Sequence, residues 1–196
     1  MINSHLVKVP AQKAYRLFNV GGTTLVSASH NGVSDVMPAT WACPLDIVPF
    51  KATVVIDKSH FTRPLIEKSG YFALMLPTMQ TIETVMKLGS ISKNDMEDKL
   101  EKSGAQFFTF DEFDMPMVKG CAAYAIFKLI PEEHNQKTYD LFIGEAVAVY
   151  ADDRVFTNGH FIFENADPKW STLHYVAGGR FYSIHDATDV AGYEED

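Results

Sequence analysis

Short β-strand patterns in hairpin-sized pairs recur along this chain, and this recurrence constrains the fold more than any other feature. The clearest pair is 23–29 and 33–42, which flank Asn31-Gly32, because Asn-Gly tolerates the positive φ angles of a type I′ turn. Further strand patterns lie at 53–56, 71–76, 120–130 and 138–150. Helical patterns are fewer and do not alternate with the strands as in a parallel sheet. The sequence therefore predicts a mainly β (α+β) fold, an antiparallel barrel with a few peripheral helices.

Glycine and proline residues and polar segments predict where the helices, turns and loops lie. Pro38 is expected to break or bulge the ladder of its strand, because proline has no N–H to donate, and so to leave backbone N–H groups facing a ligand. Gly89 is expected to cap a helix over 79–88, and Gly21-Gly22 to form a turn. The other helices are expected at 10–18, 62–69 and 95–103, with loops or irregular structure at 111–116, 131–136 and 156–163. We expect one domain over 1–185 and a loose acidic tail over 186–196.

Composition limits the functions that are open to the chain. A formal net charge of -8 argues against binding nucleic acid, whose phosphates require a basic surface. No run approaches the roughly 18 apolar residues of a membrane helix, and residues 1–10 lack the apolar core of a signal peptide. Two cysteines, Cys43 and Cys121, cannot form a disulfide framework. We therefore expect a cytoplasmic protein with no membrane segment and no nucleic-acid partner.

One segment joins a strand to a helix through groups that suit an anion. The β-branched run 53–56 leads into Lys58, Ser59, His60, Thr62 and Arg63, and a short helix follows. The first N–H groups of a helix lack intrahelical partners, so hydroxyls and cations delivered there make a ready anion site. The alternative is that Thr62 caps the helix while the cations lie in solvent.

Three stretches near this segment, and three later ones, carry a family resemblance. They are Val36-Met37-Pro38-Ala39-Thr40-Trp41, Lys58 to Ile66, Phe72 to Pro77, Gly89 to Asp95 with Lys99, Leu141 to Val147, and Leu173 to Tyr182. In this serial order, over nearly the whole chain, the sequence resembles the flavin reductase-like, flavoredoxin-type family of FMN-binding split-barrel proteins. The resemblance implies that the barrel is a split β-barrel and that the protein is a homodimer.

The resemblance also implies which residues bind FMN. The phosphate is expected at Lys58, Ser59, His60, Phe61 and Thr62, and the isoalloxazine ring along Met37, Pro38, Ala39, Thr40 and Trp41. Ser90 and Ser92 fall on a loop near the flavin, although Ser92-Lys93-Asn94 lacks the glycine that the family often has there. Two alternatives stay open: Thr40 and Trp41 are plain strand residues with a buried indole, and 90–93 is an ordinary polar loop.

On this reading the protein is an FMN-dependent oxidoreductase that passes a hydride or electrons from NAD(P)H or a redox protein through bound FMN. No catalytic dyad is visible, so no catalytic side chain is assigned. There is no Rossmann fingerprint either, so NAD(P)H is expected to dock transiently. The alternative is a non-catalytic FMN electron carrier or a flavin- or haem-binding module. The histidines lack metal-ligand spacing, so no metal is expected, and Cys43 is expected to be a small buried residue.

The aromatic-rich segment 173–182 has two interpretations that the sequence leaves open. Tyr175, Phe181 and Tyr182 have apolar bodies with partly polar tips, a composition enriched at interfaces, which favours a place in the dimer contact. The alternative, which the sequence by itself favours over the interface, is that they close their own barrel; only the family resemblance favours the interface.

Overall fold

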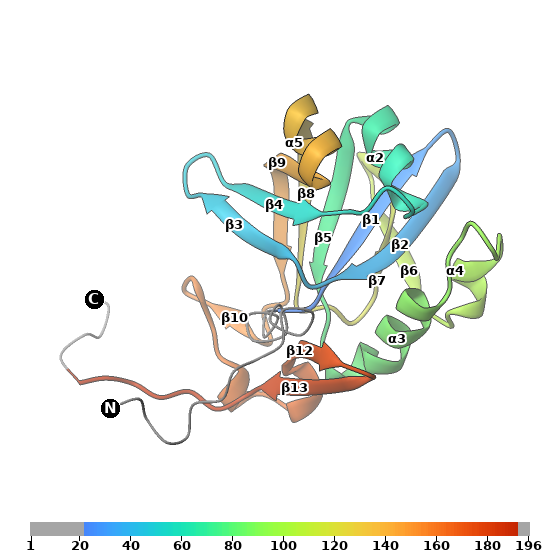
Figure 1. Ribbon diagram of the computed structural model, residues 1–196. Coiled ribbons are helices and arrows are strands. Elements are labelled where there is room, and N and C mark those ends of the chain that lie inside the picture. Colours follow the sequence, from blue (N-terminus) through green and yellow to red (C-terminus); the bar gives the residue numbers. More distant parts are fainter. Residues whose placement is uncertain (1–21, 192–196) are drawn as a thin grey trace, which may run out of the picture.

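The computed structural model describes residues 22–191, and its centre is a seven-stranded antiparallel sheet in the order β2-β1-β5-β8-β9-β4-β3. The sheet curls into a half-barrel, as Figure 1 shows. This confirms the predicted split-barrel fold class. Its strands are β1 Thr24–His30, β2 Val33–Ala39, β3 Ala42–Asp46, β4 Lys51–Val55, β5 Tyr71–Leu76, β8 Ala123–Ile130 and β9 Leu141–Ala151.

Small hairpins and short helices surround this sheet. The hairpins pair β6 Phe107–Phe110 with β7 Phe113–Val118, β10 Phe156–Thr157 with β11 His160–Phe161, and β12 Thr172–Ala177 with β13 Arg180–Ile184. The α-helices are α2 Thr62–Ser69, α3 Ile82–Ser90, α4 Lys99–Lys102 and α5 Glu133–Tyr139, and the 3₁₀ turns are η2 Met79–Thr81, η3 Phe163–Asn165 and η4 Pro168–Trp170. In Figure 1, α2 and α5 lie at one end of the half-barrel, and α3 lies beside the β12–β13 hairpin at the other.

The middle of the sheet packs against a core on each face, because successive side chains of its strands point to opposite sides. Leu25 packs in the cluster beneath α3 and β7, whereas its neighbour Val26 packs in the cluster beneath α2. Phe72 of β5 stacks on Phe127 of β8 at a ring-centroid distance of 5.2 Å in that second cluster. The two cores hold α2 and α3 against β1 and β2, and this fixes the ends of the helices that matter below.

Several local predictions are confirmed. The β1–β2 hairpin turns at Asn31 and Gly32, with φ angles of 51° and 76° that suit a type I′ turn. Helix α2 has the predicted bounds, and Gly70 follows it in the left-handed conformation with φ 73°. The helix expected over 10–18 and Gly21 of the expected Gly21-Gly22 turn lie outside the described residues, and Gly22 forms an isolated antiparallel bridge with His174.

The prediction for Pro38 is wrong, because the β1–β2 register runs through Leu25↔Pro38 without a bulge. β2 is an edge strand, and an edge strand tolerates proline because its outer side needs no ladder partner. The prediction for Gly89 is also wrong: α3 continues through Gly89 to Ser90. Its missing side chain serves packing, as described below.

Three segments that were expected to be irregular are ordered. Residues 111–116 span the β6–β7 turn and most of β7, so only Asp111 and Glu112 form the turn. Residues 131–136 run into helix α5, and 156–163 contain the β10–β11 hairpin. The helix expected over 95–103 is instead shorter than predicted, because only α4 is helical there. Short strands and one-turn helices carry too few periodic residues to stand out in a sequence.

Two general findings concern the described part of the chain. Among residues 22–191, no helix is long and apolar enough to cross a membrane. Within the same residues, no group of His, Cys, Asp and Glu side chains gathers as metal ligands would.

Candidate functional site

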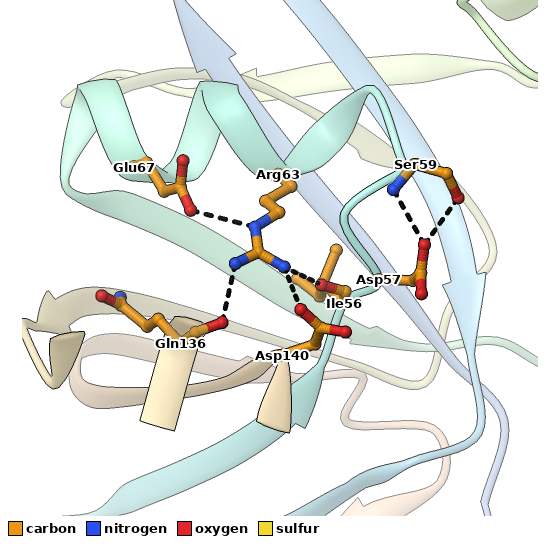
Figure 2. Close-up of polar contacts among 7 residues, drawn as sticks. All are labelled: Ile56, Asp57, Ser59, Arg63, Glu67, Gln136 and Asp140. Atoms are coloured by element: carbon orange, nitrogen blue, oxygen red, sulfur yellow. Dashed lines mark hydrogen bonds and ion pairs between the residues drawn. The ribbon is translucent and has the colours of Figure 1, made fainter. Parts of the chain in front are cut away.

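The segment between β4 and α2 forms a tight turn around Asp57. The carboxylate of Asp57 accepts hydrogen bonds from the backbone N–H of Ser59 at 2.8 Å and from its hydroxyl at 2.7 Å (Figure 2). The N–H of His60 donates to the Asp57 carbonyl at 3.1 Å. The hydrogen bonds from Ser59 hold the pKa of Asp57 below its ordinary value. This turn delivers residues 59–61 to the start of α2, where the first N–H groups have no intrahelical acceptor.

Arg63 points away from this turn, so the prediction that it belongs to the anion site is wrong. Its guanidinium donates to the carbonyl of Ile56 at 3.1 Å, to the carbonyl of Gln136 at 2.7 Å, and to the carboxylate of Asp140 (Figure 2). Its Nε pairs with Glu67 one turn along α2 at 3.0 Å. Arg63 therefore ties α2 to α5 and the start of β9.

Thr62 does not cap α2. The N-cap residue is Phe61, and no side chain caps the helix there. The Thr62 hydroxyl is fully buried and donates to Oδ2 of Asp35 on β2 at 2.6 Å. This bond fixes the first turn of α2 against the edge strand β2. The Thr62 side chain therefore supports the site from behind.

A polar depression of about 490 Å³ opens at the start of α2. It lies between β2, the 59–61 turn, the end of α3 and the loop that leads to α4. Its lining residues are Asp35, Met37, Pro38, Ser59, His60, Phe61, Leu88, Gly89, Ser90, Ile91, Ser92, Lys93, Asn94, Asp95 and Lys99.

A second, more apolar depression of about 380 Å³ adjoins it. Its lining residues are Thr23, Pro38, Ala39, Thr40, Val85, Met86, Gly89, Ser90, Tyr175 and Phe181. The two depressions share Pro38, Gly89 and Ser90, so they adjoin at these residues. We name the pair the α2–α3 cleft, with a polar end and an apolar end.

The middle of the cleft depends on the absence of a side chain at Gly89. A Cβ built there would lie 2.7 Å from Cγ of Pro38, closer than such atoms approach in real structures. Helix α3 therefore lies directly against the Pro38 ring, and any side chain larger than hydrogen would force β2 and α3 apart.

Two aromatic rings from the end of the chain wall the apolar end. Tyr175 of β12 and Phe181 of β13 have their ring centroids 5.1 Å apart. The backbone N–H of Tyr175 donates to the hydroxyl of Thr23 at 3.1 Å, which fixes the hairpin beside β1. Both rings line the cleft of their own chain, whereas Leu173 is fully buried and Tyr182 is 52% exposed.

The loop after α3 holds the polar end in shape and carries residues that the site prediction missed. Lys93 donates to the carbonyl of Ser34 at 2.7 Å, and its Nζ lies 5.8 Å from the centroid of the Phe61 ring. Asn94 donates from its side chain to the carbonyl of Ser59 at 2.8 Å. Their position directly after Ser92 was the sequence signal that could have identified them.

Nine of the twelve predicted site residues line the α2–α3 cleft: Met37, Pro38, Ala39, Thr40, Ser59, His60, Phe61, Ser90 and Ser92. The other three do not. Thr62 lies behind the cleft wall, Lys58 is exposed outside it, and Trp41 follows Thr40 with 54% of its surface exposed, so its indole is not buried.

The two cysteines lie in different environments. Cys43 is exposed, so the prediction that it is buried is wrong, and its Sγ lies 3.3 Å from the hydroxyl of Thr53. Cys121 is buried, and burial raises the pKa of its thiol. Neither sulfur lines the α2–α3 cleft.

Comparisons with known proteins agree with this fold. The family model described as the flavin reductase like domain matches residues 18–181. An FMN-binding domain of a flavin reductases-like enzyme from Shewanella baltica OS155 is 44% identical with a TM-score of 0.85, over 94% of this chain and 96% of that one. The uncharacterized protein YddH of Escherichia coli is 33% identical over 181 residues, 91% of this chain and 94% of its own.

A flavoredoxin of Desulfovibrio vulgaris (Miyazaki F) is only 20% identical, and its TM-score of 0.75 over 98% of both chains shows a shared fold. The family match covers most of the sequence, including every strand of the central sheet and both ends of the cleft. The chain therefore belongs to the flavin reductase-like family.

Proposed function

We propose that this protein is an FMN-dependent oxidoreductase that holds FMN in the α2–α3 cleft. The observation that carries the proposal is that the two ends of the cleft adjoin. Its polar end lies at a helix N-terminus and its apolar end lies beneath two aromatic rings, and the two meet at Pro38 and Gly89. FMN has the same division into a phosphate and a flat ring system.

The polar end fits a phosphate. Helix α2 begins there, and its free first N–H groups and its dipole favour an anion, although the N–H of Arg63 already donates to the His60 carbonyl at 3.2 Å. Ser59, His60 and Lys93 add a hydroxyl, an imidazole and an ammonium group to the lining. The Ser59 donors are taken by Asp57 here, so a bound phosphate would share or exchange them.

The apolar end fits the isoalloxazine ring. One wall is the backbone of Pro38, Ala39 and Thr40, where β2 ends as an edge strand. The other wall is the pair Tyr175 and Phe181. These residues would orient the ring and keep water from it, and the backbone and Thr40 hydroxyl would offer hydrogen bonds to its polar edge.

Bound FMN would supply the hydride and electron chemistry, with NAD(P)H or a redox protein as the donor. The chain's part is to bind the cofactor, orient it and leave one face open to a donor. No side chain needs to act as an acid or base. This agrees with the lining of the ring end, whose polar side chains are only the hydroxyl groups of Thr23, Thr40, Ser90 and Tyr175.

We also propose that the working form is a homodimer, on the basis of an apolar trough on the half-barrel that shares no lining residue with the α2–α3 cleft. The trough, of about 230 Å³, is lined by residues of β1, β3, β4, β5, β8 and β9, among them Cys43, Leu76, Tyr124 and Val149, and by Phe50, which precedes β4. Exposed apolar side chains, Leu45 and Ile47 near it and Val147 on β9, extend this surface. A contiguous apolar surface of this kind usually marks a protein contact.

Reconstitution with FMN tests the function. The purified chain, loaded with FMN and desalted, should keep one flavin per chain and should oxidise NADH or NADPH in the presence of excess free flavin as acceptor. Retained FMN without NAD(P)H oxidation would identify an electron carrier that needs a protein donor. No retained FMN, or a Soret band from a haem-loaded sample with no flavin binding, would contradict the proposal.

A further inference from the structure

A buried ion pair forms the floor of the polar end of the cleft. Asp35 of β2 and Lys99 of α4 have side chains that are 2% and 3% exposed, and the Lys99 Nζ lies 2.9 Å from Oδ1 of Asp35. The other carboxylate oxygen, Oδ2, accepts the hydroxyl of Thr62 at 2.6 Å. One carboxylate therefore joins β2, α2 and α4 beneath the cleft.

The contact between Lys99 and Asp35 is one of charge. Although the two atoms lie at ion-pair distance, they do not meet the geometry of a hydrogen bond. Asp35 Oδ1 is thus the one buried side-chain oxygen or nitrogen in residues 22–191 with no hydrogen-bond partner. A charge buried in a medium of low effective dielectric acts strongly on other charges nearby. The main effect of Lys99 is therefore to neutralise the negative charge of Asp35, and the main effect of Asp35 is to neutralise the positive charge of Lys99.

Both charges lie next to the end of the cleft where we propose that the phosphate binds. Asp35 and Lys99 both line the polar end, and Thr62, which is bonded to Asp35, is the first residue of α2. A lone carboxylate behind the N-terminus of α2 would oppose an anion there and offset the helix dipole. A neighbouring ammonium group removes that opposition.

We propose that Lys99 is a positioning residue whose charge neutralises Asp35 and so makes the cleft compatible with a phosphate. This inference rests on the proposed function, because it concerns the phosphate of FMN. Lys99 does not bind the phosphate itself in this account, since its ammonium group is buried against Asp35 and leaves little surface for a ligand. Asp35 in turn holds the first turn of α2 through Thr62.

The test compares FMN with riboflavin, which lacks the phosphate, by flavin fluorescence titration at pH 7. The variants are Lys99→Met, Asp35→Asn and the double variant, with thermal unfolding measured for each. Lys102→Met is the matched control, because Lys102 lies on the same helix and its ion pair with Asp98 is exposed.

Opposite charge effects are expected from the two single variants. Lys99→Met should weaken FMN relative to riboflavin by at least about tenfold, a change of about 1.4 kcal/mol. Asp35→Asn should raise the ratio of FMN affinity to riboflavin affinity, because the positive charge of the buried Lys99 ammonium group is then no longer neutralised. The double variant and Lys102→Met should keep the wild-type ratio to within about twofold. A purely structural role would lower both affinities together and leave the ratio unchanged.

The double variant keeps the test decisive if a lone buried charge prevents folding, because removing both partners of a buried pair is often neutral for stability. An unchanged ratio in the folded double variant, together with a shifted ratio in whichever single variant folds, supports the proposal; an unchanged ratio in every folded variant overturns it. A tenfold loss of FMN selectivity in the double variant would make Lys99 a direct phosphate ligand and overturn it, as would wild-type selectivity in folded Lys99→Met. Failure of the wild-type chain to bind FMN at all would instead contradict the proposed function.

Discussion

Gly89 of α3 lies so close to Pro38 of β2 that a Cβ at Gly89 would come within 2.7 Å of the proline Cγ. The two residues come from elements about fifty positions apart, and they meet where the polar and apolar ends of the α2–α3 cleft join. The shape of the cleft is therefore set by a contact between the α3 backbone and the Pro38 ring that tolerates only glycine.

Gly89→Ala should disturb this junction. Alanine favours a helix by about 1 kcal/mol over glycine, but the new methyl group must push α3 away from the rigid proline ring. We expect FMN affinity to fall by at least about tenfold, or about 1.4 kcal/mol, measured by fluorescence titration.

Two other glycines serve as controls for that measurement. Gly22→Ala meets nothing within 4 Å and should have little effect. Gly144→Ala would meet Phe72 and Phe127 at 2.6–2.7 Å, so it should destabilise the core by about 1–3 kcal/mol without changing the affinity of the folded protein for FMN. Unchanged FMN affinity in Gly89→Ala would show that the junction does not touch the cofactor.

Arg63→Ala should destabilise the protein and leave phosphate recognition intact. Its guanidinium is nearly buried and bonds to Asp140 and to the carbonyls of Ile56 and Gln136 (Figure 2), and none of these residues lines the cleft. Removing one partner of such a pair costs about 3 kcal/mol, which urea denaturation would measure. If the folded variant lost FMN binding but kept riboflavin binding, Arg63 would belong to the phosphate site after all.

The case of Arg63 shows how far the sequence could predict this site. The sequence correctly predicted that a strand leads into helix α2, and it predicted the bounds of that helix. Both predictions rest on local signals, which are the β-branched residues of the strand and the glycine after the helix. The sequence could not tell which of Lys58, His60 and Arg63 faces a ligand. That depends on partners such as Asp140, which lie far along the chain and reach Arg63 only after the sheet has formed.

Tertiary structure also explains the error at Pro38. Proline was expected to break the ladder, but the strand order places β2 at an edge, where its missing N–H has no consequence. Likewise, Tyr175 and Phe181 are distant in sequence from β2 and reach the cleft only through the β12–β13 hairpin. Strand order and long-range packing of this kind have no local signature.

Trp41 provides an optical test of where the flavin ring lies. Trp41 follows Thr40, a residue of the apolar end, and FMN bound there should quench its emission strongly by energy transfer. The measurement needs Trp170→Phe as background, with its folding checked, because Trp170 is buried against Arg154. Unchanged Trp41 emission at saturating FMN would place the ring elsewhere.

Cys43 reports on the proposed dimer contact. Its thiol is exposed in the single chain and lines the apolar trough, so a thiol reagent should label it at low protein concentration. A dimer formed over the trough should slow this labelling as the concentration rises. Cys121 is the internal control and should stay unreactive until the protein unfolds, because it is buried. Labelling of Cys43 that does not change across a dimerisation seen by light scattering would move the interface to another surface.

The most direct test of the central claim is the affinity of the chain for FMN compared with riboflavin, measured in one titration series at low ionic strength. The polar end of the cleft is predicted to recognise the phosphate, so FMN should saturate at one per chain and bind at least about tenfold more tightly than riboflavin. High salt should narrow the difference, since part of it is electrostatic. Equal affinities for the two ligands, or no saturable binding of FMN, would contradict the account.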